Sequence, residues 1–137
     1  MYIIASILIL SVGLYAQMES VPFVLESEPV LVSPGSITEH AGKLFPKLVF
    51  QEANIRAVLQ FFAETGDVNF VIDPPVDAKV NLKLYDITWE TGLTSVLNTF
   101  ELVITQDGNV YRVQNLEDYR QRITDARDYN KKQQELL

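Results

Sequence analysis

Hydrophobic residues recur at helical spacing in two stretches of the chain between Lys47 and Gln114. In each stretch they step by three and four positions, which places them on one side of an α-helix. Asn54 and Thr88 precede the two stretches, where a short polar side chain accepts a hydrogen bond from the first helical turn. Gly66 follows the first stretch and is predicted to take the left-handed position that ends a helix. The stripes are Ile55, Val58, Leu59 and Phe62, then Trp89, Leu93, Val96, Leu97 and Phe100.

Residues 79–85 alternate between polar and apolar, which is typical of a strand with one face toward the core and one toward water. Val80, Leu82 and Leu84 are expected to face the core. The side chains between them are expected to face solvent, and these are Lys79, Asn81, Lys83 and Tyr85.

Four further short runs of apolar and β-branched residues predict strands, at residues 48–50, 68–72, 102–105 and 110–113. Asp107-Gly108 separates the last two and is typical of a two-residue type I′ hairpin turn. The predicted order is strand, helix, strand, strand, helix, strand, strand. This order indicates an α+β fold with a small mixed β-sheet and two helices on one face.

The first sixteen residues, 1–16, contain an unbroken uncharged run from Tyr2 to Ala16. Such a run is short for a membrane span and suits the hydrophobic region of a signal peptide, with cleavage after Ala16. The alternative is a short N-terminal anchor that stays in the inner membrane. Either interpretation predicts that the remainder of the chain is exported.

Residues 17–46 are rich in proline and glycine and are predicted to form a linker. Two apolar islands lie within it, at Val21–Leu25 and Val30–Val32. We expect an extended tether, with an edge strand formed by either island as the alternative. The pattern in residues 115–137 predicts a charged helical tail. One line of positions along it recurs at spacings of three and four, as in an imperfect heptad repeat.

Composition excludes several classes of function. The net charge of −7 argues against a nucleic-acid partner and against adhesion to anionic lipid headgroups. The chain has no cysteine, which removes disulfides, thiolate nucleophiles and sulfur-ligated metal sites. The tail carries equal numbers of acidic and basic residues, so the negative charge resides in residues 17–114.

No set of residues has the spacing of a catalytic, cofactor or metal site. His40 lies in the linker without a nucleophile or carboxylate at a telling spacing. Asp73 and Asp77 flank a Pro-Pro turn, where capping of the turn is expected instead of calcium binding. A phosphate-binding glycine loop and a Gly-x-Ser-x-Gly elbow are both missing from the sequence. We therefore expect a protein that is not an enzyme and that uses no cofactor.

The outward side of strand 79–85 is the candidate partner-binding face, formed by Lys79, Asn81, Lys83 and Tyr85. It concentrates positive charge in an otherwise acidic module and carries an exposed aromatic ring. Docking of a protein partner is one interpretation, and ordinary solubilisation of the strand is the other. Trp89, by contrast, is expected to be a buried anchor beneath the second helix.

Several short motifs follow one another between Phe50 and Gln114. They are Phe50 with Ala53 and Ile55, the segment Asn69-Phe70-Val71-Ile72-Asp73-Pro74, the strand Val80-Asn81-Leu82, Trp89 at the start of the second helix, and Gly108-Asn109-Val110. As a set they resemble the secretin and TonB short N-terminal domain, and within it the periplasmic N-domain of type IV pilus secretins. The sequence departs from that pattern at Ala78, where glycine is usual. It departs again at Gly92, where alanine is usual and glycine costs a helix about 1 kcal/mol.

The resemblance implies a periplasmic protein-protein interaction module at the cell envelope of a Gram-negative-type bacterium. The implied partners are a secretin ring or inner-membrane assembly proteins, and the implied assembly is a ring of identical copies. Because no gate-forming secretin region follows in this sequence, we expect an accessory or truncated component of a type IV pilus or type II-like secretion complex. The alternative is a signalling module of a TonB-dependent transport and anti-sigma system. Membrane association is expected only through the N-terminal segment or the complex.

Overall fold

A computed structural model describes residues 28–137 of the chain. The predicted signal peptide or anchor at 1–16, and the linker residues up to 27, lie outside the described residues. Within residues 28–137, no helix is both long enough and apolar enough to cross a membrane.

The helices and strands follow the predicted order, with one additional strand at the start. In chain order they are β1 (Val30–Val32), the 3₁₀ turn η1 (Pro34–Ser36), β2 (Leu44–Asn54), α2 (Ile55–Gly66), β3 (Phe70–Ile72), β4 (Lys79–Thr88), α3 (Trp89–Thr99), β5 (Leu102–Asp107), β6 (Val110–Asn115) and α4 (Leu116–Glu135). The mixed α/β fold class and the charged C-terminal helix are confirmed.

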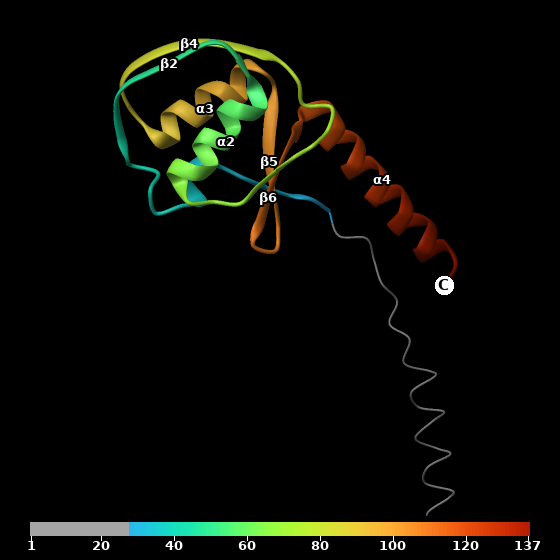
Figure 1. The fold of residues 1–137 in the computed structure, drawn as a ribbon. Helices are drawn as coiled ribbons and strands as arrows, with labels where there is room; N and C mark the ends of the chain where they lie inside the picture. The colour runs from blue at the N-terminus through green and yellow to red at the C-terminus, as the bar shows by residue number, and fades with distance from the viewer. Residues whose placement is uncertain (1–27) are drawn as a thin grey trace, which may run out of the picture.

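The strands divide into two sheets, where the residue pattern predicted one. A four-stranded sheet has the order β1-β5-β6-β3, and β2 pairs with β4 in a separate antiparallel ribbon. In the larger sheet β3 runs parallel to β6, and the other pairs are antiparallel. Helices α2 and α3 lie between the ribbon and the larger sheet (Figure 1). Apolar positions on both sides of the helices are therefore covered, which a single sheet would not achieve.

Trp89 is the centre of the core, as predicted. Its side chain is fully buried, and its indole N–H donates a hydrogen bond to the carbonyl oxygen of Phe62 at 2.9 Å. The Phe62 ring meets the indole edge to face, with ring centres 6.1 Å apart. Packing explains why position 92 is glycine where alanine is usual. An added Cβ would lie 3.2 Å from the Phe62 ring. The absence of a side chain lets α3 approach α2 closely.

Both predicted helix starts are confirmed. The side chain of Asn54 accepts a hydrogen bond from the N–H of Arg56 at 2.8 Å, and Thr88 accepts one from Thr91 at 3.2 Å. The predicted end of α2 is wrong by one residue. Gly66 is the last helical residue, and Asp67 takes the left-handed conformation with φ of 53°. Glycine is required at position 66 for a different reason, because the indole of Trp89 packs against its Cα.

The hairpin between β5 and β6 is present, and its turn lies one residue later than predicted. Asp107 pairs with Val110, so the two loop residues are Gly108 and Asn109. Gly108 has φ of 64° and Asn109 does not have a positive φ. A single positive φ at the first loop position fits a type II′ turn in place of type I′.

The beginning of the folded region differs from the linker expected at 17–46. Val30–Val32 forms edge strand β1, the alternative given for that apolar island, and pairs with β5 from Val30↔Gln106 to Val32↔Ile104. Strand β2 begins at Leu44, before the predicted domain start at Lys47, and pairs with β4 as far as Asn54↔Lys79. Pairing with distant strands therefore orders β1 and the start of β2, although their proline and glycine content had predicted an extended tether.

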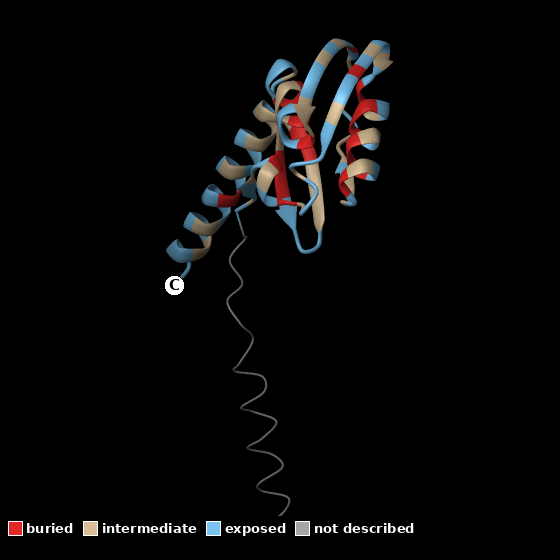
Figure 2. Ribbon diagram, turned by 90° about the vertical axis from the view of Figure 1, so that its left-hand side faces the viewer, coloured by how far each residue is buried: buried red, intermediate tan, exposed pale blue. Residues whose placement is uncertain are grey.

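Helix α4 packs its first turns on the outer side of the four-stranded sheet and then projects away from it (Figure 2). A buried polar network fixes this contact. The Gln114 side chain is fully buried and donates to Thr105 Oγ1 at 3.0 Å, while Arg122 Nη1 donates to Gln114 Oε1 at 3.0 Å. A buried amide that lost these partners would be costly, so the network favours one placement of the helix.

Candidate partner-binding site

All four side chains of the predicted partner-binding face are exposed on the outer side of the β2–β4 ribbon. They are Lys79, Asn81, Lys83 and Tyr85, each separated from the next by one residue that turns inward. Strand β2 adds Lys47 opposite Tyr85 and Val49 opposite Lys83. We call the surface formed by these six residues the ribbon face. Its role as a binding surface remains a prediction.

One end of the ribbon face is electrically neutralised. Glu52 lies where the β2–β4 register shifts between Phe50 and Ala53, and its φ of 48° turns it toward β4. Its carboxylate lies 3.5 Å from Lys79 Nζ and accepts a hydrogen bond from the Asn81 amide at 3.0 Å. Asn81 Oδ1 accepts in return from the backbone N–H of Glu52 at 2.9 Å. Lys79 and Asn81 therefore stabilise the bulge, and little free positive charge remains there.

Unneutralised positive charge on this surface is concentrated around Tyr85. The ammonium groups of Lys83 and Lys47 lie 5.6 and 6.0 Å from the centre of its ring. At these distances the ring face attracts both cations. Tyr85 itself is 54% exposed. The arrangement presents an accessible aromatic ring between two lysines, which suits an acidic partner segment with an apolar or aromatic side chain.

The sequence pattern did not identify Lys47, Val49 or Glu52 as parts of this surface. Alternation showed which side of β4 faces solvent, but it carries no information about which strand lies beside it. A shallow hollow of about 240 Å³ on the ribbon is lined by Val49, Phe50, Gln51, Asn81, Leu82 and Lys83.

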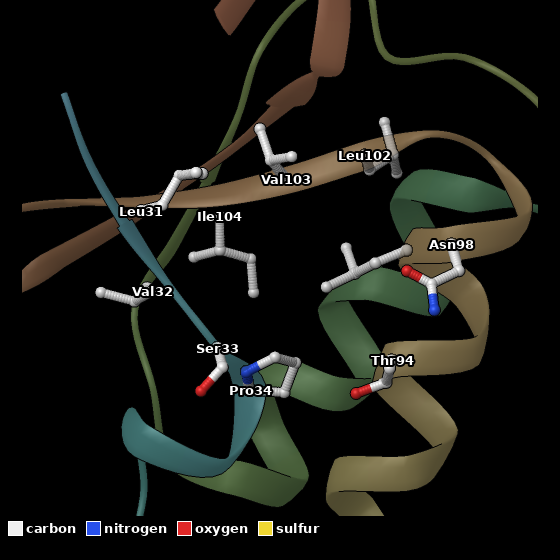
Figure 3. Close-up of a pocket in the computed structure, with 10 residues that line it drawn as sticks. Leu31, Val32, Ser33, Pro34, Thr94, Asn98, Leu102, Val103 and Ile104 are labelled. Atoms are coloured by element: carbon white, nitrogen blue, oxygen red, sulfur yellow. The ribbon is translucent and has the colours of Figure 1, made fainter.

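A second depression, of about 370 Å³, is an apolar groove between β1, α3 and β5 (Figure 3). The pairing of β1 with β5 ends at Val32↔Ile104, and the chain then turns away at Pro34. The groove opens where the two strands separate. Its lining residues are Leu31, Val32, Ser33, Pro34, Thr94, Leu97, Asn98, Leu102, Val103 and Ile104. None of these side chains is ionisable, so the groove suits apolar contact and offers no acid-base chemistry.

The other residues considered as catalytic or metal-binding candidates form contacts within the fold. His40 is partly exposed and lies 3.8 Å from the carboxylate of Glu39. Asp73 forms an ion pair with Arg112 at 3.2 Å. Arg56 donates to the carbonyl oxygens of Ile72, Asp73 and Val76, and so holds the Pro-Pro turn from inside. Among residues 28–137, no three His, Asp or Glu side chains are grouped as metal ligands.

Comparison with known proteins finds sequence relatives for about half of the chain. No family model matches the sequence. The type IV pilus biogenesis and competence protein PilQ of Neisseria meningitidis is 33% identical over 66 residues, which are 48% of this chain and 9% of PilQ. The DNA utilization protein HofQ of Escherichia coli is 33% identical over 69 residues, 50% of this chain and 17% of HofQ.

Among solved structures, a mutant of the N-terminal domain of the secretin XcpQ from Pseudomonas aeruginosa aligns with a TM-score of 0.46 at 22% identity. That alignment covers 51% of this chain and 36% of the XcpQ domain chain. The chain spans less than a fifth of the length of the curated relatives it matches. The sequence relatives confirm that about half of this chain resembles a segment of the type IV pilus secretins.

Proposed function

We propose that this chain is a non-enzymatic interaction module of an envelope complex, of the type IV pilus or type II-like secretion kind. In this proposal it works in the periplasm as an accessory or truncated component and contacts a secretin ring or inner-membrane assembly proteins. The observation that carries the proposal is the 33% identity to the type IV pilus protein PilQ over 66 residues, which are 48% of this chain.

The ribbon face is the proposed docking surface because it holds accessible positive charge in an otherwise acidic module. Residues 47–114 contain five basic side chains, namely Lys47, Arg56, Lys79, Lys83 and Arg112. Both arginines bind groups around the Pro-Pro turn, and Lys79 is paired with Glu52. Lys47 and Lys83 remain, and both ammonium groups lie near the ring of Tyr85. Positive charge at one place on an acidic protein steers acidic partners toward that place.

The ribbon also offers backbone groups to a partner. In the described structure β2 and β4 pair only with each other, so each has an outer edge without a neighbouring strand. An extended partner segment can add to such an edge through main-chain hydrogen bonds, while side chains on the face provide specificity.

The test is a charge reversal at the two free lysines, Lys47→Glu with Lys83→Glu. Lys79 is left unchanged because a glutamate there would face Glu52 and disturb the bulge. The matched control is Lys131→Glu with Lys132→Glu, which makes the same charge change on exposed positions of α4. Each protein is crosslinked in native envelopes at two salt concentrations, and melting temperatures verify that folding is intact.

The proposal expects the Lys47/Lys83 variant to capture the partner at least about tenfold less well at low salt, with a smaller difference at high salt. The control is expected to capture it normally. Equal capture by both variants would refute docking through the ribbon face. Capture of a TonB-dependent receptor or an anti-sigma regulator, in place of a pilus or secretion protein, would refute the assignment to a pilus or secretion complex.

A further inference from the structure

The apolar groove between β1, α3 and β5 has an uncharged lining and a carboxylate at each end (Figure 3). At one end the carboxylate of Glu90 lies against the Cα of Gly35, next to the lining residue Pro34. At the other end Glu101 directly precedes the lining residue Leu102. Both glutamates are exposed, and neither forms an ion pair within the described part of the chain. The groove therefore suits an apolar segment that also carries positive charge.

The projecting half of α4 carries such a segment on its exposed side. Tyr129, Lys132 and Leu136 occupy positions i, i+3 and i+7, so they lie on one side of the helix. All three are exposed, Tyr129 at 45% and Leu136 at 80%. We call these three side chains the α4 stripe. Apolar anchors at this spacing are those with which an amphipathic helix binds an apolar groove.

The α4 stripe cannot reach the groove of its own chain. Helix α4 begins beside one end of that groove, because the N–H of Leu116 donates a hydrogen bond to the carbonyl oxygen of Glu101 at 2.9 Å. Leu136 lies twenty positions later, about 30 Å further along the helix. Over this length the helix projects away from the domain (Figure 2). A contact between the stripe and the groove therefore joins two copies of the chain.

We propose that the α4 stripe of one copy binds in the apolar groove of a second copy. The two surfaces match in length. The stripe spans seven positions, about 10 Å, and the side of the groove formed by α3 runs from Glu90 to Asn98, about 12 Å. They also match in charge, because Lys132 stands between the two apolar anchors and the groove has a carboxylate at each end.

Binding removes apolar surface of both copies from water, which is the driving force of the contact. The groove, of about 370 Å³, receives side chains that are otherwise exposed. The contact area is small, so the contact is weak between free copies and acts where neighbouring copies are already held close together. It does not depend on which envelope complex the protein serves, since both surfaces belong to this chain.

Disulfide trapping between two copies tests the contact, because the chain has no cysteine of its own. One copy of the full chain carries Asn98→Cys, at the α3 side of the groove, and a second copy with a larger tag carries Leu136→Cys. In the matched control the second copy carries Gln134→Cys, two positions earlier and on the opposite side of the helix. A further comparison adds Lys132→Glu or Lys131→Glu to the Leu136→Cys copy, because only Lys132 belongs to the stripe.

Under mild oxidation, the mixed disulfide is expected to form at least about tenfold faster with Leu136→Cys than with Gln134→Cys. Lys132→Glu is expected to slow this reaction at least about threefold, and Lys131→Glu to leave it unchanged. Gel mobility of the mixed product reports the rates, and melting temperatures verify that the variants are folded. Equal rates at the two cysteine positions, equal effects of the two lysine reversals, or no mixed product while a thiol reagent labels both cysteines would overturn the proposal. Disulfides chiefly between two Leu136→Cys copies would assign α4 to a second α4 and would also overturn it.

Discussion

Replacing Gly66 by alanine adds one methyl group directly against the buried indole of Trp89. In an ordinary helix this change is stabilising, because glycine costs roughly 0.5–1 kcal/mol relative to alanine. Here an ideal Cβ would lie 2.6 Å from Cε2 and 2.9 Å from Nε1 of the indole. Those separations are well inside ordinary van der Waals contact, so either the ring or the helix must move.

The surroundings leave little room for that movement. The indole is fully buried, and its N–H is held by the carbonyl oxygen of Phe62 at 2.9 Å. The carbonyl oxygen of Gly66 accepts a hydrogen bond from Thr38 Oγ1 at 2.6 Å, which also restrains the helix end. Overpacking of a filled core costs about 1–3 kcal/mol. After the gain in helix propensity is subtracted, we expect Gly66→Ala to destabilise the protein by about 0.5–2 kcal/mol.

Urea unfolding followed by tryptophan fluorescence measures the effect, since Trp89 is the single tryptophan of the chain. Gly42→Ala is the matched control, because a Cβ at position 42 meets no atom within 4 Å. The control is expected to change the free energy of unfolding by less than about 0.5 kcal/mol. A Gly66→Ala protein as stable as the parent would refute the argument that the indole requires glycine there.

Three further predictions follow from the sequence and the core. Trp89→Ala removes the central buried side chain and its hydrogen bond, so it should cost about 3–5 kcal/mol in the free energy of unfolding measured by circular dichroism; an unchanged melting temperature would contradict its burial. Asp67→Gly relieves a left-handed residue at the end of α2 and should stabilise the protein by about 0.5–1 kcal/mol in urea unfolding, with a loss of stability as the contrary result. The mature protein should begin at Gln17 in a periplasmic extract, and N-terminal sequencing that finds Met1 on membrane-bound protein would replace the signal peptide with an anchor.

Much of the candidate site could be predicted from one strand. The alternation in 79–85 correctly placed Lys79, Asn81, Lys83 and Tyr85 in solvent, because successive side chains of a strand point to opposite faces. The same pattern could not distinguish a lysine paired with Glu52 from one beside Tyr85. That difference depends on β2, whose register with β4 brings Lys47 and Glu52 to the same surface.

The sequence by itself determined the features whose causes are local. Helical spacing fixed the two core helices, Asn54 and Thr88 fixed their starts, and the apolar stripe of α3 identified Trp89 as an anchor. Each of these depends on residues within a few positions of one another, where chain connectivity already sets the geometry.

Only the tertiary structure decided features that join distant residues. Strand β2 pairs with β4 some thirty residues later, and β1 pairs with β5 more than seventy residues later. The two-sheet division therefore has no local signal, and the apolar run at Val30–Val32 allowed an edge strand without deciding between it and a tether. The sequence indicated Gly66 only as a helix end. In the structure it packs against the indole of Trp89, which lies 23 positions later in the chain. Hydrophobic patterning states which side of an element is buried, but the partner that buries it is chosen by packing across the whole domain.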